Sequence, residues 1–208
     1  MNGIRLAVIG AGAAGDHHLR AAARVRGVDV VGVCDSDRGL RESGAASVGA
    51  SAYEDSDAVF SDRAVDAVII ATPASTHLGL AAAALRAGKH VLIEKPVSDD
   101  AAAIRRIAAR AQALGLVAMP GHNYVYLPEA RRMVEAVRRG ELGAPRAAFM
   151  TYAISHAESL AALYGPVLSE VMVHHAYLAY ACFGRPTSMV AGQSRPGWSE
   201  LATSDRAG

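Results

Sequence analysis

The chain has 208 residues, enough for one large domain or two smaller ones, and 51% of them are hydrophobic, which leaves ample material for a buried core. Its 21 Lys and Arg residues nearly balance its 20 Asp and Glu residues, so no net field draws it to nucleic acid or an anionic membrane, and a small molecule is the expected partner. The chain has only two cysteines, Cys34 and Cys182, which argues against a disulfide framework. We expect a cytoplasmic protein, because the sequence shows neither a secretory leader nor an apolar run long enough to span a membrane.

Short apolar runs alternate with alanine-rich segments through the first part of the chain. The runs predict strands at 4–9, 28–34, 67–71, 90–93 and 116–119, and the alanine-rich stretches between them, beginning with about 14–25, predict helices. Strands separated by helices require right-handed crossovers and a parallel sheet covered on both faces, which explains why the strands are almost wholly apolar. The sequence therefore predicts the α/β class, with a doubly wound parallel Rossmann sheet over residues 1–122.

The pattern changes beyond residue 122. We expect a helix at 128–139, a strand of a different sheet at 144–153, a helix at about 168–183 and a strand at 187–191. The polar tail, residues 192–208, is expected to be poorly ordered. Residues 123–208 are thus interpreted as a short, incomplete α+β second domain that serves substrate binding and oligomerisation.

A glycine-rich turn, Gly10-Ala11-Gly12-Ala13-Ala14-Gly15, joins the first predicted strand to the first predicted helix. In a dinucleotide site the first glycine permits the tight turn, the second lets the backbone approach a pyrophosphate, and the third allows close helix packing. Asp35 lies twenty residues further on, at the end of the second strand, where a carboxylate would bind the ribose hydroxyls and repel a 2′-phosphate. The context favours an NAD site, with NADP disfavoured, over a glycine turn that binds nothing. The cofactor-binding candidates here are Gly10, Gly12, Ala13, Ala14, Gly15 and Asp35.

Two further segments follow predicted strands and are expected to border the nicotinamide, because ligands of doubly wound sheets bind outside the carboxyl ends of the strands. Residues 71–77 follow the third strand, and Glu94-Lys95-Pro96 follows the fourth. Lys95 is placed to move a proton beside a reacting alcohol or carbonyl, and a solvated lysine at a strand end is the alternative. The additional cofactor-binding candidates are Thr72, Pro73, His77, Glu94 and Lys95.

These motifs resemble the Gfo/Idh/MocA oxidoreductases: the glycine turn with His18 after it, Asp35, residues 71–77, Glu94-Lys95-Pro96 and Gly121-His122-Asn123-Tyr124. The resemblance covers about the first 125 residues and continues more loosely to about residue 190. It implies that Lys95 is catalytic and that a hydride passes between NAD(P) and a hydroxyl or carbonyl carbon of a sugar, a cyclitol or a related small molecule. Whether the net reaction is a redox reaction, an isomerisation, an epimerisation or an elimination stays open.

The same family carries the pattern Asp-x-Gly-x-His-x-x-Asp on a helix of its second domain, where an acid and a histidine reach the substrate. Here Glu170, Met172, His174 and Tyr177 occupy the four positions, so only the histidine is kept. Glu170, His174 and Tyr177 share one helix face by spacing, and we expect His174 to act as general base with Glu170 orienting it. A buried structural histidine is the alternative. A metal site formed by Glu170 and His174 lacks a third ligand, so no metal is expected.

The expected substrate contacts are His122, Asn123, Tyr124 and Tyr177, with a structural hinge as the alternative for 122–124. The family's second domain is normally far longer, so this chain is expected to be either a fragment or a short member. A sheet left at about two strands exposes unpaired edges, which favours a homo-oligomer. Because Met172 and Tyr177 differ from the family pattern, a non-catalytic protein that binds NAD or has a regulatory role stays an alternative interpretation.

Overall fold

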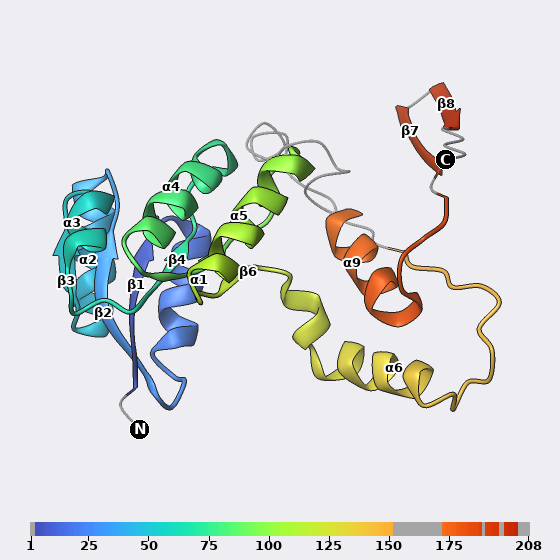
Figure 1. Ribbon diagram of the computed structural model, residues 1–208, viewed down its shortest axis with the longest axis horizontal. Helices are drawn as coiled ribbons and strands as arrows, with labels where there is room; N and C mark the ends of the chain where they lie inside the picture. The colour runs from blue at the N-terminus through green and yellow to red at the C-terminus, as the bar shows by residue number, and fades with distance from the viewer. Residues whose placement is uncertain (1–2, 152–171, 189, 196–197, 204–208) are drawn as a thin grey trace. The chain divides into compact units, whose positions relative to one another are not determined.

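The computed structural model describes residues 3–151, 172–188, 190–195 and 198–203. The chain divides into two compact units, Met1–His122 (unit 1) and Asn123–Gly208 (unit 2), which are drawn in Figure 1.

Unit 1 contains a six-stranded parallel sheet. Its strands are β1 (Ile4–Ile9), β2 (Val28–Cys34), β3 (Ser51–Tyr53), β4 (Ala67–Ile70), β5 (His90–Ile93) and β6 (Ala118–Pro120). They are ordered β3-β2-β1-β4-β5-β6, which is the strand order of a doubly wound dinucleotide-binding sheet. The predicted Rossmann fold is confirmed, and the order reverses between β1 and β4.

Helices connect these strands: α1 (Ala13–Ala22), α2 (Arg38–Val48), α3 (Ser56–Ser61), α4 (Ala74–Arg86) and α5 (Ala101–Ala113). Alternate side chains of the strands enter two separate apolar clusters, as the period of two along a strand requires. Ala7, Ile9 and Ile70 belong to one cluster, and Leu6 and Val8 belong to the other, which also contains Leu19 of α1. Both faces of the sheet are therefore packed, which explains the uninterrupted apolar strands of the sequence.

Strand β3 and helix α3 were not predicted from the sequence. They are only three and six residues long, too short for a recognisable apolar period. Helix α3 nevertheless begins with a standard cap, because the side chain of Asp55 accepts a hydrogen bond from the Ala58 amide.

Unit 2 contains η1 (Asn123–Tyr126), α6 (Pro128–Arg138), α9 (Met172–Phe183) and an antiparallel pair, β7 (Val190–Arg195) and β8 (Trp198–Thr203). The strand predicted at 144–153 is wrong for its described part, because residues 144–151 form no strand. They follow Gly143 at φ +66°, and Pro145 lacks an amide proton for a strand ladder. The described residues of the predicted polar tail, 192–195 and 198–203, belong to β7 and β8, where the sequence predicts no strand.

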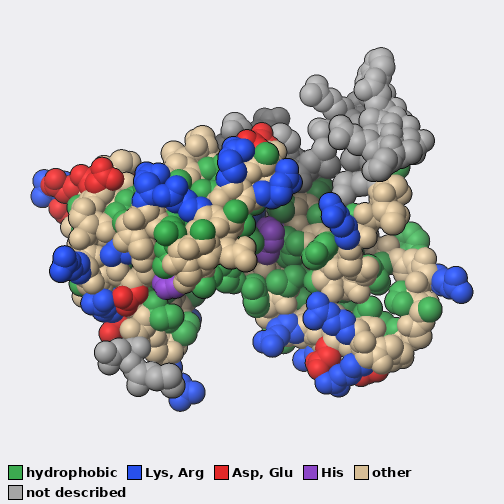
Figure 2. All heavy atoms as spheres, viewed as in Figure 1, with side chains coloured by type: hydrophobic (Ala, Val, Ile, Leu, Met, Phe, Trp, Pro, Cys, Tyr) green, Lys and Arg blue, Asp and Glu red, His purple; other side chains and the backbone are tan. Residues whose placement is uncertain are grey.

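Basic and acidic side chains are interspersed on the face of the molecule shown in Figure 2. None of the described helices combines the length and apolar character needed to cross a membrane.

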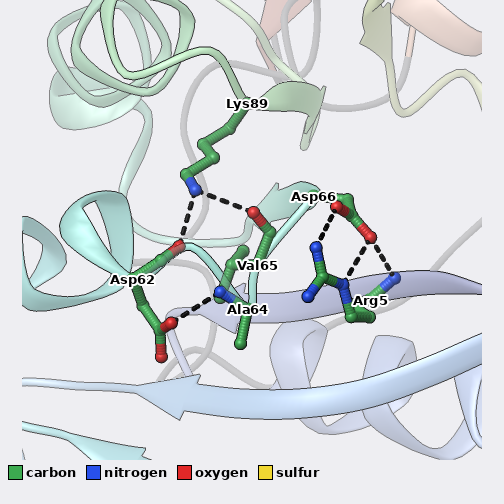
Figure 3. Close-up of polar contacts among 6 residues, drawn as sticks. All are labelled: Arg5, Asp62, Ala64, Val65, Asp66 and Lys89. Carbon is green, nitrogen blue, oxygen red and sulfur yellow. Dashed lines mark hydrogen bonds and ion pairs between the residues drawn. The ribbon is translucent and has the colours of Figure 1, made fainter.

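A buried lysine just before β5 binds the connection between α3 and β4 in unit 1. Lys89 is only 7% exposed, and its ammonium group donates hydrogen bonds to the carbonyl oxygens of Asp62 at 2.6 Å and Val65 at 2.7 Å (Figure 3). Beside it, the Arg5 guanidinium binds the carboxylate of Asp66, whose pKa it lowers to about 2. Lys89 thus donates hydrogen bonds to two backbone carbonyl groups in the connection between α3 and β4.

Replacing Lys89 with Met should lower the free energy of unfolding by about 1–3 kcal/mol, because the carbonyl oxygens of Asp62 and Val65 each lose the hydrogen bond from its ammonium group. The midpoint of urea unfolding, followed by circular dichroism, measures this loss. Arg86→Met is the matched control, since Arg86 is exposed at the end of α4. Equal midpoints for the two variants would contradict a structural role for Lys89.

Candidate dinucleotide site

The candidate site lies at the neighbouring carboxyl ends of β1 and β4, where the chain continues into α1 after one strand and into α4 after the other. The strand order reverses between β1 and β4, and this reversal opens a crevice outside the carboxyl ends of the strands, which is where doubly wound sheets bind ligands. The backbone of the glycine turn comes very close to the end of β4, because a Cβ atom at Gly10 would lie 2.6 Å from the carbonyl oxygen of Ala71. Gly10 also has a φ of +93°, which favours glycine.

The three glycines of the turn meet different constraints. A Cβ atom at Gly15 would lie 1.8 Å from the carbonyl oxygen of Gly10, so helix α1 can pack against the turn only with glycine there. A Cβ atom at Gly12 would meet no heavy atom within 4 Å, and the φ of Gly12 is an ordinary −66°. Packing within the protein thus requires Gly10 and Gly15 but not Gly12, which leaves the approach of an external group as the physical reason for the second glycine.

The two helices that begin at the crevice differ from the other helices of unit 1. Asp37, Asp55 and Asp100 cap α2, α3 and α5 with their side chains. Helices α1 and α4 begin at Gly12 and Pro73 without a side-chain cap. Ala13 and Ala14 in the first turn of α1 are exposed and carry only methyl groups. The first backbone amides of α1 therefore stay available to an anion.

Asp35 closes the crevice from the end of β2. One of its carboxylate oxygens accepts a hydrogen bond from the Ala11 amide at 2.7 Å, and the other accepts one from the Asp37 amide at 2.8 Å. Asp35 is half-buried, and a carboxylate has about four lone-pair positions, so it keeps acceptors for ribose hydroxyls. The glycine turn and the acidic residue are joined directly, as the predicted site requires.

A pocket of about 610 Å³ occupies this crevice. Its walls include Gly12, Asp35, Thr72 and Pro73, together with Glu54 and Asp55 from the β3–α3 connection. Its lining in the described chain contains three carboxylates and neither Lys nor Arg. A larger hollow of about 1070 Å³ lies over the sheet at residues such as Arg5, Asp66 and His90, but none of the predicted site residues lines it, so we assign the site to the smaller pocket.

Glu54 and Asp55 were missed in the sequence because the elements that position them, β3 and α3, were not predicted. The only signal available was the acidic pair before a short apolar run, which also fits an ordinary helix cap. Nearby, Arg41 donates to the carbonyl oxygens of Asp35 and Ser36 at 3.4 Å.

Glu94 connects helix α1 with the turn that carries Lys95. His18 of α1 donates from Nε2 to one carboxylate oxygen of Glu94 at 2.8 Å, and the Lys95 amide donates to the other at 2.8 Å. Burial raises the pKa of Glu94, but the bonds from His18 and the Lys95 amide outweigh it, so that the pKa lies below its usual value. The ionised carboxylate thus holds the start of the turn, and Lys95 itself is half-buried.

His77 lies between the turns that follow β4 and β5. Its side chain is only 1% exposed, with Nε2 2.7 Å from the carbonyl oxygen of Thr72 and Nδ1 3.0 Å from that of Pro96. Both ring nitrogens are therefore directed at backbone, so His77 links Thr72 to the 94–96 turn and does not line the pocket. Burial lowers the pKa of His122, the last residue of unit 1, although the nearby charge of Glu94 opposes this shift.

The predicted residues of unit 2 are brought together in part. His174 on α9 is 9% exposed and lies against Tyr177 of the same helix and Tyr124 of η1. Asn123 also reaches this group through Tyr177. Glu170 lies outside the described residues, so no contact is assigned to it. Among the described residues, no group of three His, Cys, Asp or Glu side chains is arranged to hold a metal ion.

Residues 4–122 match the model of a family described as an oxidoreductase family with an NAD-binding Rossmann fold, GFO_IDH_MocA. The chain is 34% identical over 151 residues to 4-carboxy-2-hydroxymuconate-6-semialdehyde dehydrogenase from Sphingobium sp. strain NBRC 103272 / SYK-6, covering 72% of this chain and 48% of that protein. It is 37% identical over 146 residues to inositol 2-dehydrogenase 1 from Saccharopolyspora erythraea, covering 68% and 43%.

Among solved structures, GenD2 from gentamicin A biosynthesis in complex with NAD superposes with a TM-score of 0.76 at 26% identity. The match covers 92% of this chain and 56% of that one. The chain spans about half the length of the curated relatives it matches.

Gly12→Ala should leave stability nearly unchanged and weaken NADH binding at least tenfold, because the added methyl group meets only the space that a diphosphate would occupy. Thermal unfolding and titration of NADH fluorescence measure the two effects. Gly79→Ala is the control, since Gly79 on α4 also has open space around its Cβ position and is not itself among the residues that line the pocket. Unchanged NADH affinity in the Gly12 variant would remove the reason for placing a diphosphate at this turn.

Proposed function

Because the chain belongs to the Gfo/Idh/MocA oxidoreductase family, we propose that it takes part in NAD-dependent dehydrogenation or reduction of a small polyhydroxylated molecule, such as a sugar or a cyclitol. One observation carries the proposal: the open Gly12 position and the Asp35 carboxylate lie on one crevice and are joined through the Ala11 amide. Inositol 2-dehydrogenase among the relatives supports a substrate with several hydroxyl groups.

The crevice fits a dinucleotide on the protein's own geometry. The amides at the start of α1 would hold the diphosphate, Asp35 would bind the adenosine ribose, and Thr72 and Pro73 would line the path towards the nicotinamide. When bound, the nicotinamide ring accepts or supplies the hydride. Asp35, Glu54 and Asp55 give the pocket a negative lining that would repel a 2′-phosphate, so NAD is the proposed form and NADP is disfavoured.

Lys95 is the proposed proton-transfer group. The chain has only two lysines among its 21 basic residues, and the other one, Lys89, is bound to two backbone carbonyls. Arginine cannot give up its proton in proteins, so Lys95 is the basic residue suited to exchange one with a substrate hydroxyl. In the oxidation direction, neutral Lys95 takes the hydroxyl proton while the hydride leaves the same carbon, and in the reduction direction both steps reverse.

Unit 2 is proposed to bind the substrate and to mediate self-association. His174 and Glu170 are the further candidate catalytic residues, as the family resemblance implies, and Tyr177 is a candidate substrate contact on the same helix face. His122, Asn123 and Tyr124 are the other candidate substrate contacts, with a structural hinge as the alternative. The two-stranded β7–β8 ladder has unpaired edges within the described residues of its sheet, which favours a homo-oligomer. A cytoplasmic location is proposed because both cysteines are buried and free.

A non-catalytic protein that binds NAD is the second candidate, favoured by Met172 and Tyr177 where the family pattern has Gly and Asp. A bulkier side chain and the loss of a carboxylate would both act against substrate turnover. This candidate predicts NADH binding without any substrate-dependent change in nicotinamide absorbance.

Lys95→Ala and Lys95→Arg should each lower turnover at least a thousandfold and leave NAD affinity within about threefold, because the cofactor contacts proposed above do not depend on proton exchange. The Arg variant keeps the charge and removes only the exchangeable proton. Nicotinamide absorbance with a panel of inositols and aldoses measures turnover, and calorimetry measures NAD binding. Full turnover in the Arg variant would contradict the role of Lys95, and absence of turnover in the wild type with intact NAD binding would favour the non-catalytic protein.

A further inference from the structure

The connection between β3 and α3 carries two of the three carboxylates that line the dinucleotide pocket, Glu54 and Asp55, which we call the acidic wall. Strand β3 has three residues and lies at the edge of the sheet, where it pairs with β2. Residues 54–58 are exposed or half-buried, and the first buried residue of α3 is Val59. The placement of the acidic wall therefore depends on how the two ends of this segment are held.

Tyr53 holds the first end with both its ring and its hydroxyl group. A Cβ atom at Gly32 of β2 would clash with a ring carbon of Tyr53, so the ring occupies the space beside β2 that a side chain at position 32 would fill. The hydroxyl oxygen lies 2.6 Å from a carboxylate oxygen of Asp62, the residue that follows α3. This bond lowers the pKa of Asp62, and an ionised carboxylate can only accept a hydrogen bond, so Tyr53 is the donor.

Asp62 holds the other end of the segment. Its second carboxylate oxygen accepts a hydrogen bond from the Ala64 amide at 2.6 Å, and its carbonyl oxygen accepts one from the buried Lys89 (Figure 3). Within the segment, Asp55 caps α3 through the Ala58 amide. The bond from Tyr53 to Asp62 thus closes residues 53–62 into a loop that contains the acidic wall and is fixed to the rest of unit 1 at its far end.

The charges at this end of the pocket oppose one another. Burial raises the pKa of the Cys34 thiol to about 11, and the charges of Asp55 and Asp35 contribute in the same direction, so both carboxylates act on the same part of the pocket lining. The charge of Arg41 acts against them, and its guanidinium group donates to the carbonyl oxygens of Asp35 and Ser36. Arg41 would attract the 2′-phosphate that the carboxylates repel, so the place of the acidic wall affects which dinucleotide binds.

We propose that Tyr53 is a positioning residue for cofactor choice: its bond to Asp62 holds the acidic wall beside the pocket, and the wall rejects a dinucleotide that carries a 2′-phosphate. The inference rests on the proposed function, which places a dinucleotide in this pocket. Tyr53 is not itself among the residues that line the pocket, so it acts through the wall. Without the bond, the like charges of the wall and Asp35 move the wall towards solvent, and Arg41 is less opposed.

The ratio of the dissociation constants for NADPH and NADH, measured by fluorescence titration at low ionic strength, reports cofactor choice. We expect the wild type to favour NADH. Glu54→Gln removes one charge from the wall and should lower the ratio about three- to tenfold. Tyr53→Phe keeps the ring and should also lower the ratio. Adding Tyr53→Phe to Glu54→Gln should lower the ratio less than Tyr53→Phe does alone, because Tyr53 acts through the wall.

Asp100→Ala is the matched control for a loss of stability. It removes the side-chain cap of α5, so it should lower the melting temperature and leave the ratio of the wild type unchanged. Asp62→Ala removes the acceptor in place of the donor and should lower the ratio as Tyr53→Phe does, and it decides the matter if the Phe variant does not fold.

Hydrogen exchange followed by mass spectrometry tests the loop without any cofactor. Tyr53→Phe should speed exchange over residues 54–62, and Asp100→Ala should not. A wild type that favours NADPH, or a ratio or an exchange rate that Tyr53→Phe leaves unchanged, would overturn the inference, as would fully additive effects of Tyr53→Phe and Glu54→Gln. A wild type that binds neither nucleotide would refute the proposed function, whereas binding of both with an unchanged ratio in Tyr53→Phe would refute this inference alone.

Discussion

The close contact between the glycine turn and the end of β4 is the constraint on which the rest of unit 1 depends. The crevice exists because the strand order reverses between β1 and β4. The glycine turn and the backbone at Ala71 can approach each other closely because Gly10 has no Cβ atom, which would lie 2.6 Å from the carbonyl oxygen of Ala71. Gly15 then allows α1 to pack directly on that turn. With these two positions fixed by packing, the amides at the start of α1 face the crevice, and Asp35 can join the turn through the Ala11 amide.

The polar residues around the crevice divide into those that line it and those that hold its walls. Asp35 and Thr72 line the pocket, whereas His77 and Glu94 direct their polar atoms at backbone or at His18. His77 joins the turns after β4 and β5, and Glu94 joins α1 to the Lys95 turn. Glu94 therefore links the start of the Lys95 turn to α1, the helix that follows the glycine turn, through one carboxylate.

The sequence was sufficient for the parts of the fold that repeat a strong local pattern. Long apolar strands and alanine-rich helices identify the doubly wound sheet, and the turn at 10–15 with Asp35 identifies the crevice. Glu54 and Asp55 could not be predicted, because they depend on a three-residue strand and a six-residue helix without a recognisable period. The 144–151 segment shows the opposite error, since residues with strand propensity form a strand only where a partner accepts their backbone bonds.

Spacing along α9 correctly places His174 and Tyr177 on one face, but spacing cannot assign the donor in a hydrogen bond. The 2.6 Å between the Tyr177 hydroxyl oxygen and Nδ1 of His174 establishes the contact, and the tautomer of His174 decides which of the two groups donates. The two residues that differ from the family pattern change different properties of the helix: Met172 is a larger side chain where the pattern has glycine, whereas Tyr177 places a hydroxyl group against His174. The family pattern has an aspartate at position 177, and the hydroxyl group that replaces it can donate a hydrogen bond as well as accept one, whereas an ionised carboxylate can only accept.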